Sequence, residues 1–239
     1  MSEKKYNSFK IFSPDEIRFR KENVVGDEYL KILENVKKII RFQQKNYIND
    51  GIPGFLFHGD VGLGKTLISK VLAKELNCYL IFIDGADIAR SLYGQSEKQI
   101  SILFQKAKEF RYSLILIDDC ESIFPTRDWI KGESWHLAQN NVFFHQIDGL
   151  NTSKISVILT TNRFDLIDKA IKDRLYNVEF PKPSRKTLVE IAKRKCLKLK
   201  LNFSNIKSKI NFDEIESMRS LEKEILVIYI NEILKNEHE

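Results

Sequence analysis

The sequence predicts an α/β protein with a mainly parallel sheet covered by helices, followed by a small helical unit. Three observations lead to this prediction. Short apolar runs recur up to residue 180, helical patterns separate them, and after Lys182-Pro183-Ser184 the helical pattern continues without another strand. Strands that alternate with helices need crossover connections, which give a parallel sheet with both faces covered.

Five apolar runs are the predicted strands. The first is Phe55-Leu56-Phe57, which follows the breaker cluster Gly51-Ile-Pro-Gly54, and the others cover residues 79–83, 114–117, 155–159 and 178–180. Apolar residues recur at helical spacing over residues 29–42, 66–76, 97–110 and 136–147. The chain is therefore divided into an N-terminal tail (1–18), an α/β core (19–180) and a helical lid (181–239).

Composition places the chain among ordinary globular proteins. Of its 239 residues, 43% are hydrophobic and 30% are charged, with a net charge of +6. Cys78, Cys120 and Cys196 lie far apart, which argues against a zinc ribbon or a disulfide framework and favours the reducing cytoplasm. The N-terminus has no apolar signal segment, and no apolar run approaches the length of about 20 residues that spans a membrane.

Charge is distributed unevenly in the predicted lid. Lys and Arg dominate residues 182–209, where Glu190 is the single acid, whereas acids dominate from Asp213 onward. Three interpretations remain open: two solvated helix faces, a nucleic-acid footprint, or patches of opposite sign that meet between neighbouring subunits.

A glycine-rich motif follows the first predicted strand. Gly59-Asp-Val-Gly-Leu-Gly-Lys-Thr66 matches G-x-x-x-x-G-K-[ST], the P-loop pattern, and opens a helix. Its glycines let backbone N–H groups turn inward as an anion site, to which the helix N-terminus adds its dipole. Lys65 is placed to reach the outer phosphates of ATP, and Thr66 to bind Mg²⁺. The residues expected to contact the nucleotide here are Gly59, Asp60, Val61, Gly62, Leu63, Gly64, Lys65, Thr66 and Leu67.

Polar residues follow two further predicted strands. Asp118 and Asp119 come directly after the run 114–117, and Asn162 ends the run that starts at Val157. A carboxylate at the end of a buried strand is costly unless it meets a cation, so Asp118 is expected to bind Mg²⁺. Asp119 is then placed to orient or activate water, and Asn162 to hold that water or the γ-phosphate.

With these parts in order, the chain resembles the AAA family of AAA+ ATPases, of the proteasomal-ATPase and FtsH type. The likeness runs from about residue 19 to 199. Matching segments are Asn23-Val-Val-Gly26, Gly94-Gln-Ser-Glu-Lys98, Ile117-Asp-Asp-Cys-Glu-Ser122, Asp148-Gly149-Leu150 and Thr160-Thr-Asn-Arg163. The resemblance implies a P-loop NTPase fold in three α/β/α layers, a parallel five-stranded sheet in the order 5-1-4-3-2, a helical lid and a hexameric ring.

The resemblance also implies roles for individual residues. Val24, Val25 and Gly26 match a segment whose backbone faces adenine. Arg174 matches an arginine that reaches the neighbouring subunit's nucleotide, an effect worth about 10³–10⁵ in rate. Arg219, in the weak lid match Ser217-Met-Arg-Ser-Leu-Glu222, matches a second nucleotide-sensing arginine. Leu92, Tyr93 and Gly94 match the pore loop that grips an extended polypeptide.

Three departures from the family pattern qualify these expectations. Asp119 stands where the family has a catalytic glutamate, and a misplacement of about 1 Å can cost roughly 10²-fold in rate, so slow hydrolysis is predicted. A single arginine, Arg174, occupies a segment that usually carries two. The pore loop has Leu92-Tyr93-Gly94 instead of aromatic–hydrophobic–Gly.

Three functional hypotheses follow. The first is a homo-oligomeric ATPase motor that remodels or unfolds polypeptides, with a polypeptide substrate or adaptor as partner. The second is a nucleic-acid loader or helicase-like ATPase that uses the basic segment 182–209. The third is a slow switch in which ATP binding sets ring assembly. The sequence lacks a His-Glu-x-x-His protease motif and the N-K-x-D element of guanine-binding proteins, and no membrane association is expected.

Overall fold

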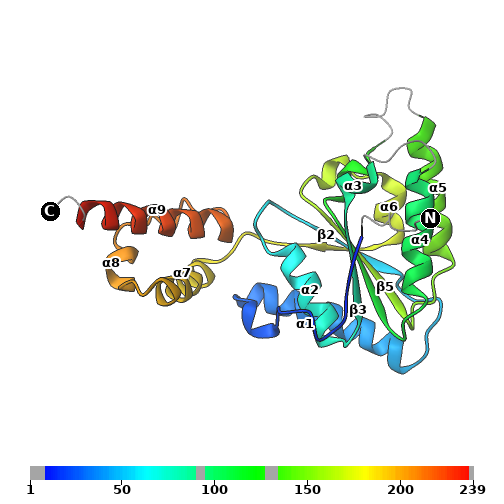
Figure 1. Cartoon of the computed structure of the whole chain (residues 1–239), viewed down its shortest axis with the longest axis horizontal. Coiled ribbons are helices and arrows are strands. Elements are labelled where there is room, and N and C mark those ends of the chain that lie inside the picture. The colour runs from blue at the N-terminus through cyan, green and yellow to red at the C-terminus, as the bar shows by residue number, and fades with distance from the viewer. Residues whose placement is uncertain (1–8, 90–94, 127–133, 237–239) are drawn as a thin grey trace, which may run out of the picture.

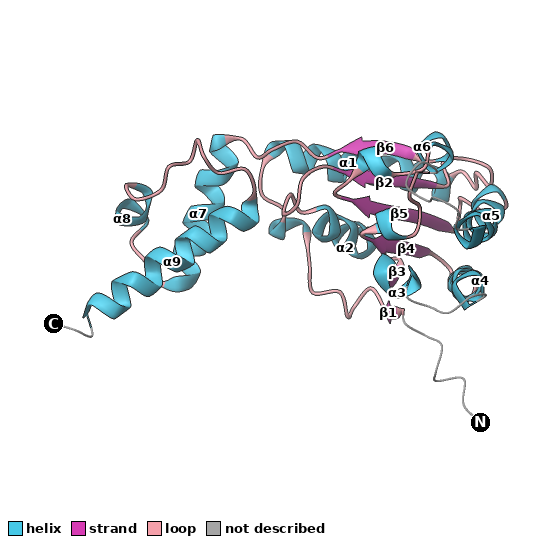
Figure 2. Ribbon diagram, turned by 90° about the horizontal axis from the view of Figure 1, so that it is seen from above, coloured by secondary structure: helices cyan, strands magenta, loops and turns pink. Residues whose placement is uncertain are grey.

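The computed structural model describes residues 9–89, 95–126 and 134–236. It contains a six-stranded sheet in the order β1-β3-β4-β5-β2-β6, which Figure 2 shows from one edge to the other. Five of its strands are β2 (Gly54–His58), β3 (Tyr79–Asp84), β4 (Ser113–Asp118), β5 (Ile155–Thr161) and β6 (Tyr176–Glu179). These five are parallel, and they have the predicted order 5-1-4-3-2.

The sixth strand corrects the prediction of a five-stranded sheet. β1 (Lys10–Phe12) lies within the predicted tail and pairs antiparallel with β3, where Ile11 faces Ile81. Its three residues are too few to produce a periodic pattern, so no local signal predicts this strand. A short strand at this position covers the open edge of β3, which would otherwise present unpaired backbone groups.

Helices cover both faces of the sheet, because alternate strand residues point to opposite sides. Phe55, Phe57 and Leu116 pack toward α1 (Asp27–Lys45) and α2 (Lys65–Glu75). Leu56, Ile115 and Leu159 pack toward α4 (Gln95–Ala107) and α5 (Ser134–Asp148), with α3 (Gly85–Ala89) and α6 (Lys169–Arg174) contributing to the same layer. Figure 1 shows these two helical layers on the two sides of the sheet. The predicted three-layer α/β/α architecture is confirmed.

The C-terminal part forms a helical unit with its own hydrophobic cluster. It consists of α7 (Arg185–Leu199), α8 (Phe203–Lys207) and α9 (Met218–Asn236). Leu188, Ala192, Leu221 and Ile225 pack together between α7 and α9. In Figure 1 this unit extends to one side of the core, and we call it the lid. Within the described ranges, no helix has the combination of length and apolar character that a membrane span requires.

The lid is joined to the core by a short segment and by polar contacts with α1. The hydroxyl of Tyr29 donates a hydrogen bond to the carbonyl of Pro181 at 2.7 Å. The carboxylate of Glu28 accepts from the Ser184 amide at 2.9 Å and from the Thr187 hydroxyl at 2.8 Å. Burial acts to raise the pKa of Glu28, but these hydrogen bonds outweigh it and lower that pKa. The start of α7 is therefore fixed against the start of α1.

Candidate nucleotide-binding site

The glycine-rich loop connects the end of β2 to the start of α2. Gly59, Gly62 and Gly64 have φ values of 139°, 82° and 85°, a region that favours glycine. A Cβ on Gly62 would lie 2.8 Å from the Cβ of Arg219, and one on Gly59 would lie 2.6 Å from the carbonyl oxygen of Phe180. The loop thus needs glycine for two reasons: its backbone conformation and its close approach to neighbouring segments.

Lys65 is fixed between the loop and the end of β5. Its Nζ donates to the carbonyl oxygens of Gly59 at 2.7 Å and Asp60 at 2.8 Å, and to Oδ1 of Asn162 at 2.8 Å. The residue is 6% exposed. Burial lowers the pKa of Lys65, while the nearby carboxylates of Asp119, Glu121 and Asp118 act in the opposite direction. A buried ammonium group with carbonyl and amide acceptors is suited to receive phosphate oxygens in their place.

Thr66 and Asp118 form the second part of the site. The Thr66 hydroxyl donates to both oxygens of Asp118, at 2.8 and 3.1 Å, and the Thr160 hydroxyl donates to Oδ1 of Asp118. Parallel strands β4 and β5 end side by side, which brings Asp118 and Thr160 together. Hydroxyl and carboxylate oxygens are the ligand types that Mg²⁺ uses together with substrate phosphates. This donor set fits the predicted Mg²⁺ site.

Asp119 and Asn162 lie side by side at the ends of β4 and β5. Nδ2 of Asn162 donates to Oδ1 of Asp119 at 3.0 Å, and the Asp119 amide donates to the Thr160 hydroxyl at 3.2 Å. Asp119 has a φ of 51°, in the left-handed region. Burial raises the pKa of Asp119, as do the charges of Asp118, Glu121 and Asp84, while Lys65 counteracts the shift. Asn162 therefore joins Lys65 and Asp119 in one hydrogen-bonded group.

Two adjoining cavities surround these groups. One, of about 440 Å³, is lined by the loop from Val61 to Gly64, by the polar cluster just described and by Arg219 of the lid. The other, of about 400 Å³, lies between the core and α7. The residues lining both are Leu63, Gly64, Leu67, Met218 and Glu222. Together the cavities offer a polar end for phosphates and a more apolar end for a base.

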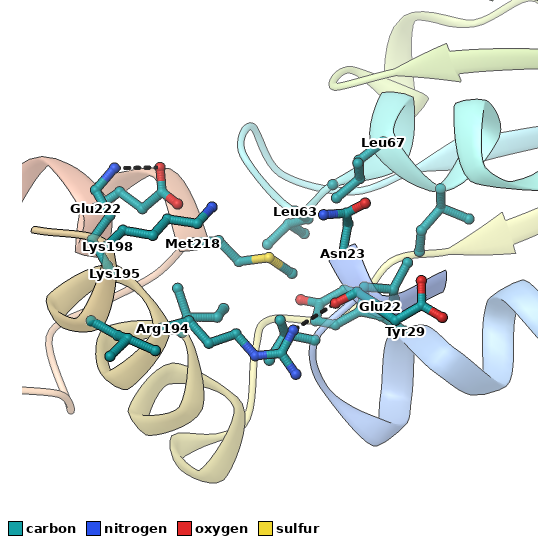
Figure 3. A pocket seen from close by; sticks show the side chains of 16 residues that line it. Glu22, Asn23, Tyr29, Leu63, Leu67, Arg194, Lys195, Lys198, Met218 and Glu222 are labelled. Atoms are coloured by element: carbon teal, nitrogen blue, oxygen red, sulfur yellow. Dashed lines mark hydrogen bonds and ion pairs between the residues drawn. The ribbon is translucent and has the colours of Figure 1, made fainter. Parts of the chain in front are cut away.

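The apolar cavity is drawn in Figure 3. Asn23, Val24 and Val25 line it from the core, together with Tyr29. Arg194, Lys195 and Lys198 of α7 line it from the lid. Arg194 donates to the carbonyl of Glu22 at 2.6 Å, and Lys195 pairs with Glu222 at 3.5 Å. A base bound here would contact core and lid at once.

Three residues that were predicted to contact the nucleotide, Gly26, Gly59 and Asp60, have other positions in the structure. Gly26 has a φ of 101° and precedes α1, and a Cβ there would lie 2.6 Å from the Thr187 hydroxyl. Gly59 and Asp60 contribute the carbonyls that hold Lys65. None of these three residues lines either cavity. Leu92, Tyr93 and Gly94 fall outside the described residues.

Arg174 lies near the amino-terminal ends of the parallel strands, whereas the glycine-rich loop follows the carboxyl-terminal end of β2. It ends α6 just before β6, whose first residue pairs with Phe55 near the start of β2, whereas the loop follows the end of β2. Its guanidinium pairs with Asp148, with Nε 3.1 Å from Oδ1. The Arg174 side chain is 37% exposed. Arg174 lines neither of the two cavities.

Several residues that line the cavities were not predicted from the sequence. Thr160 lies in the segment Thr160-Thr-Asn-Arg163, and its hydroxyl donates to Asp118. Met218, Glu222, Arg194, Lys195 and Lys198 come from the lid. Met218 and Glu222 lie within the lid match around Arg219, whereas no local pattern marks the three α7 residues, because their position depends on how the lid packs on the core.

The fold and these cavities define a P-loop nucleotide-binding protein. Residues 55–182 match the family described as "ATPase family associated with various cellular activities (AAA)". The match covers more than half of the chain, and the chain belongs to this family.

The chain is similar to named members of the family. The chain is 38% identical over 149 residues to a cell division cycle protein 48 homolog of Archaeoglobus fulgidus, covering 59% of this chain and 20% of that protein. It is 30% identical over 199 residues to the 26S proteasome regulatory subunit 8 homolog of Saccharomyces cerevisiae, covering 76% of this chain and 49% of that protein. The chain thus spans less than half the length of these relatives.

Proposed function

We propose that this chain is the ATP-hydrolysing module of a ring-forming machine that remodels or unfolds polypeptides. One observation carries the proposal. The cavity beside Lys65 and Asp118 gathers groups for phosphate, metal and water, while Arg174 faces outward at the opposite end of the strands. An arginine that its own cavity does not use is available to the cavity of a neighbouring copy.

Each polar group of the cavity has a proposed task. Lys65 binds the outer phosphates of ATP, and Arg219 approaches them from the lid. Asp119 accepts a proton from the attacking water, and Asn162 holds that water or the γ-phosphate in place. The raised pKa of Asp119 suits a proton acceptor, since a stronger base takes up the proton more readily.

Magnesium is the proposed cofactor. Thr66 and Asp118 would hold it, because their oxygens already lie together at the end of β4. When bound, Mg²⁺ neutralises the charge that develops on the phosphate oxygens. Val24, Val25 and the facing side of α7 would enclose the adenine, with Gly26 shaping the backbone next to them.

A polypeptide substrate is proposed from the named relatives, which include a proteasome regulatory subunit. The pore loop Leu92-Tyr93-Gly94 remains the proposed gripping element. We also propose that the chain assembles into a hexameric homo-oligomer and is located in the cytoplasm.

The nucleic-acid hypothesis loses support from the charges of the lid. Lys182, Arg185 and Lys195 of the basic segment pair with Glu216, Asp213 and Glu222 of the acidic segment. Lys186 pairs with Asp27 of the core. These four of the ten basic side chains of residues 182–209 thus have acidic partners outside the segment, which lowers the net positive charge that this region presents to a nucleic acid.

The proposal is tested by measuring the ATPase rate per subunit against protein concentration, with unfolded polypeptide, DNA or neither. We expect the specific rate to rise with concentration, because active sites form on assembly, and to respond to polypeptide. A rate that is independent of concentration would contradict shared active sites. A rate stimulated by DNA alone, with steep salt dependence, would favour the nucleic-acid hypothesis.

Lengthening Asp119 is expected to increase turnover. Asp119→Glu extends the carboxylate by one methylene within the cavity that Asp119 lines, and we expect kcat to rise by about 10-fold, within the roughly 10²-fold that a 1 Å misplacement can cost. Steady-state ATPase assays at saturating ATP measure this. Asp119→Asn, which keeps the size but loses the base, is the matched control and should be inactive. If Asp119→Glu is no faster, slow hydrolysis has another cause, and an inactive wild type would favour the assembly switch.

A further inference from the structure

Arg174 makes a second contact besides its ion pair. The guanidinium carbon lies 4.3 Å from the centroid of the Phe144 ring, which comes one turn before Asp148 on α5. Its Nε pairs with Asp148, and its NH1 donates to the carbonyl of Ala170 at 3.3 Å. The guanidinium is therefore held on three sides by an aromatic ring, a carboxylate and a carbonyl.

These contacts differ in how firmly they hold the arginine. Asp148 is more than half exposed, and ion pairs between exposed groups contribute little and exchange easily with water. The Phe144 ring, in contrast, is partly buried and packs against the hydrophobic core beneath α5. A planar guanidinium stacks well on an aromatic face, and the ring supplies a fixed plane for it.

The ring itself is anchored by its neighbours. Phe144 meets Phe143 edge-on, with the ring centroids 6.5 Å apart. Phe143 is 1% exposed and packs against Phe124 with the centroids 4.5 Å apart. This series of aromatic contacts connects the exposed Arg174 to the core. We therefore expect the Phe144 ring to stay in place when Arg174 exchanges Asp148 for another partner.

We infer that Phe144 is a positioning residue for Arg174, and that it holds the arginine ready for the nucleotide of the neighbouring subunit. The inference rests on the proposed function, in which Arg174 acts in trans. Asp148 can be exchanged for phosphate oxygens when subunits meet, while the stacking contact stays in place. With one arginine in this segment, orientation of that single side chain controls how often the neighbouring site is complete.

A mixture of two inactive subunits tests the inference. The pocket subunit carries Arg174→Ala and keeps its own nucleotide site, and the finger subunit carries Lys65→Ala and keeps its arginine. Each subunit alone should be nearly inactive. Mixing the two should restore ATPase activity wherever Arg174 of a finger subunit faces the intact nucleotide site of a pocket subunit. Phe144→Leu is then introduced into one of the two subunits at a time.

Phe144→Leu in the finger subunit should lower kcat of the mixture by about 3- to 10-fold, the range that a cation–π contact supports, with KM for ATP unchanged. Phe144→Tyr in the same subunit should keep the activity, because it keeps the ring. Phe144→Leu in the pocket subunit is the matched control and should change nothing, since that subunit has no arginine at position 174.

Three results would overturn the inference. Equal losses from both placements would show that Phe144 acts through general packing, and no loss from either would show that the ring is dispensable. A parental mixture that stays inactive, before any change at Phe144, would instead refute the action of Arg174 in trans, and the inference would fall with it. Thermal unfolding of each Phe144 variant checks that the core is intact.

Discussion

Arg174→Ala should lower kcat for ATP by about 10³- to 10⁵-fold in the assembled protein while leaving ATP binding nearly unchanged. The reason is the position of Arg174 at the end of the strands opposite the glycine-rich loop, from which we propose that it serves a neighbouring copy. An interaction made mainly in the transition state affects kcat and leaves ground-state affinity alone. The measurement is the steady-state ATPase rate at high protein concentration, together with titration of a fluorescent ATP analogue.

Lys169→Ala provides a matched control for this experiment. Lys169 is an exposed basic residue at the first position of the same short helix, α6. Its removal changes the charge of the helix without touching the Asp148 contact, so kcat should stay near the wild-type value. An Arg174→Ala protein that hydrolyses ATP as fast as the Lys169→Ala protein would refute the proposed role of the arginine.

Lys65→Met should weaken binding of Mg·ATP by about 100-fold or more and abolish measurable hydrolysis. The Lys65 ammonium group is buried and held by two carbonyls and the Asn162 amide. Hydrogen bonds to charged groups contribute about 1.5–3 kcal/mol each, so the loss of one or two of them accounts for an effect of this size. Isothermal titration with ATP and MgCl₂ measures the affinity.

Lys74→Met is the control on the same helix. Its Nζ donates to the carbonyl of Pro14 at 2.7 Å, and it lines neither nucleotide cavity. ATP affinity should be close to that of the wild type. Circular dichroism of both variants tests whether they fold. A folded Lys65→Met protein that binds ATP as tightly as the Lys74→Met protein would remove the basis of the proposed function.

Local patterns were sufficient for much of the fold. The strands β2 to β5 are largely apolar runs because both of their faces are buried, and β2 is fully buried up to His58, which is partly buried. The edge strand β6 is the exception, since most of its residues are exposed. The glycine-rich loop was equally clear, since its spacing, the strand before it and the helix after it all follow from binding an anion at a helix N-terminus. Asp118, Asp119 and Asn162 were found because each ends such a strand.

Other features had no local signal. Strand β1 depends on pairing with β3, since Lys10–Phe12 alone are mostly exposed and too short for a pattern. For the basic segment of the lid, the sequence left a nucleic-acid footprint open as one of three interpretations, and only the structure shows that Lys182 pairs with Glu216 and Arg185 with Asp213. Sequence patterns relate residues that are close along the chain, so they do not predict ion pairs between residues about 30 positions apart.

By itself, the sequence determined the chemistry of this protein: a glycine-rich anion loop, a lysine, and carboxylates at strand ends, whose residue types and spacing are fixed by what phosphate and metal require. Only the tertiary structure decided where these side chains lie relative to the lid and to Arg174. It placed the lid against the loop, so that core and lid line the cavities together. It also placed Arg174 on Phe144 at the opposite end of the strands, because the direction of parallel strands separates their two ends.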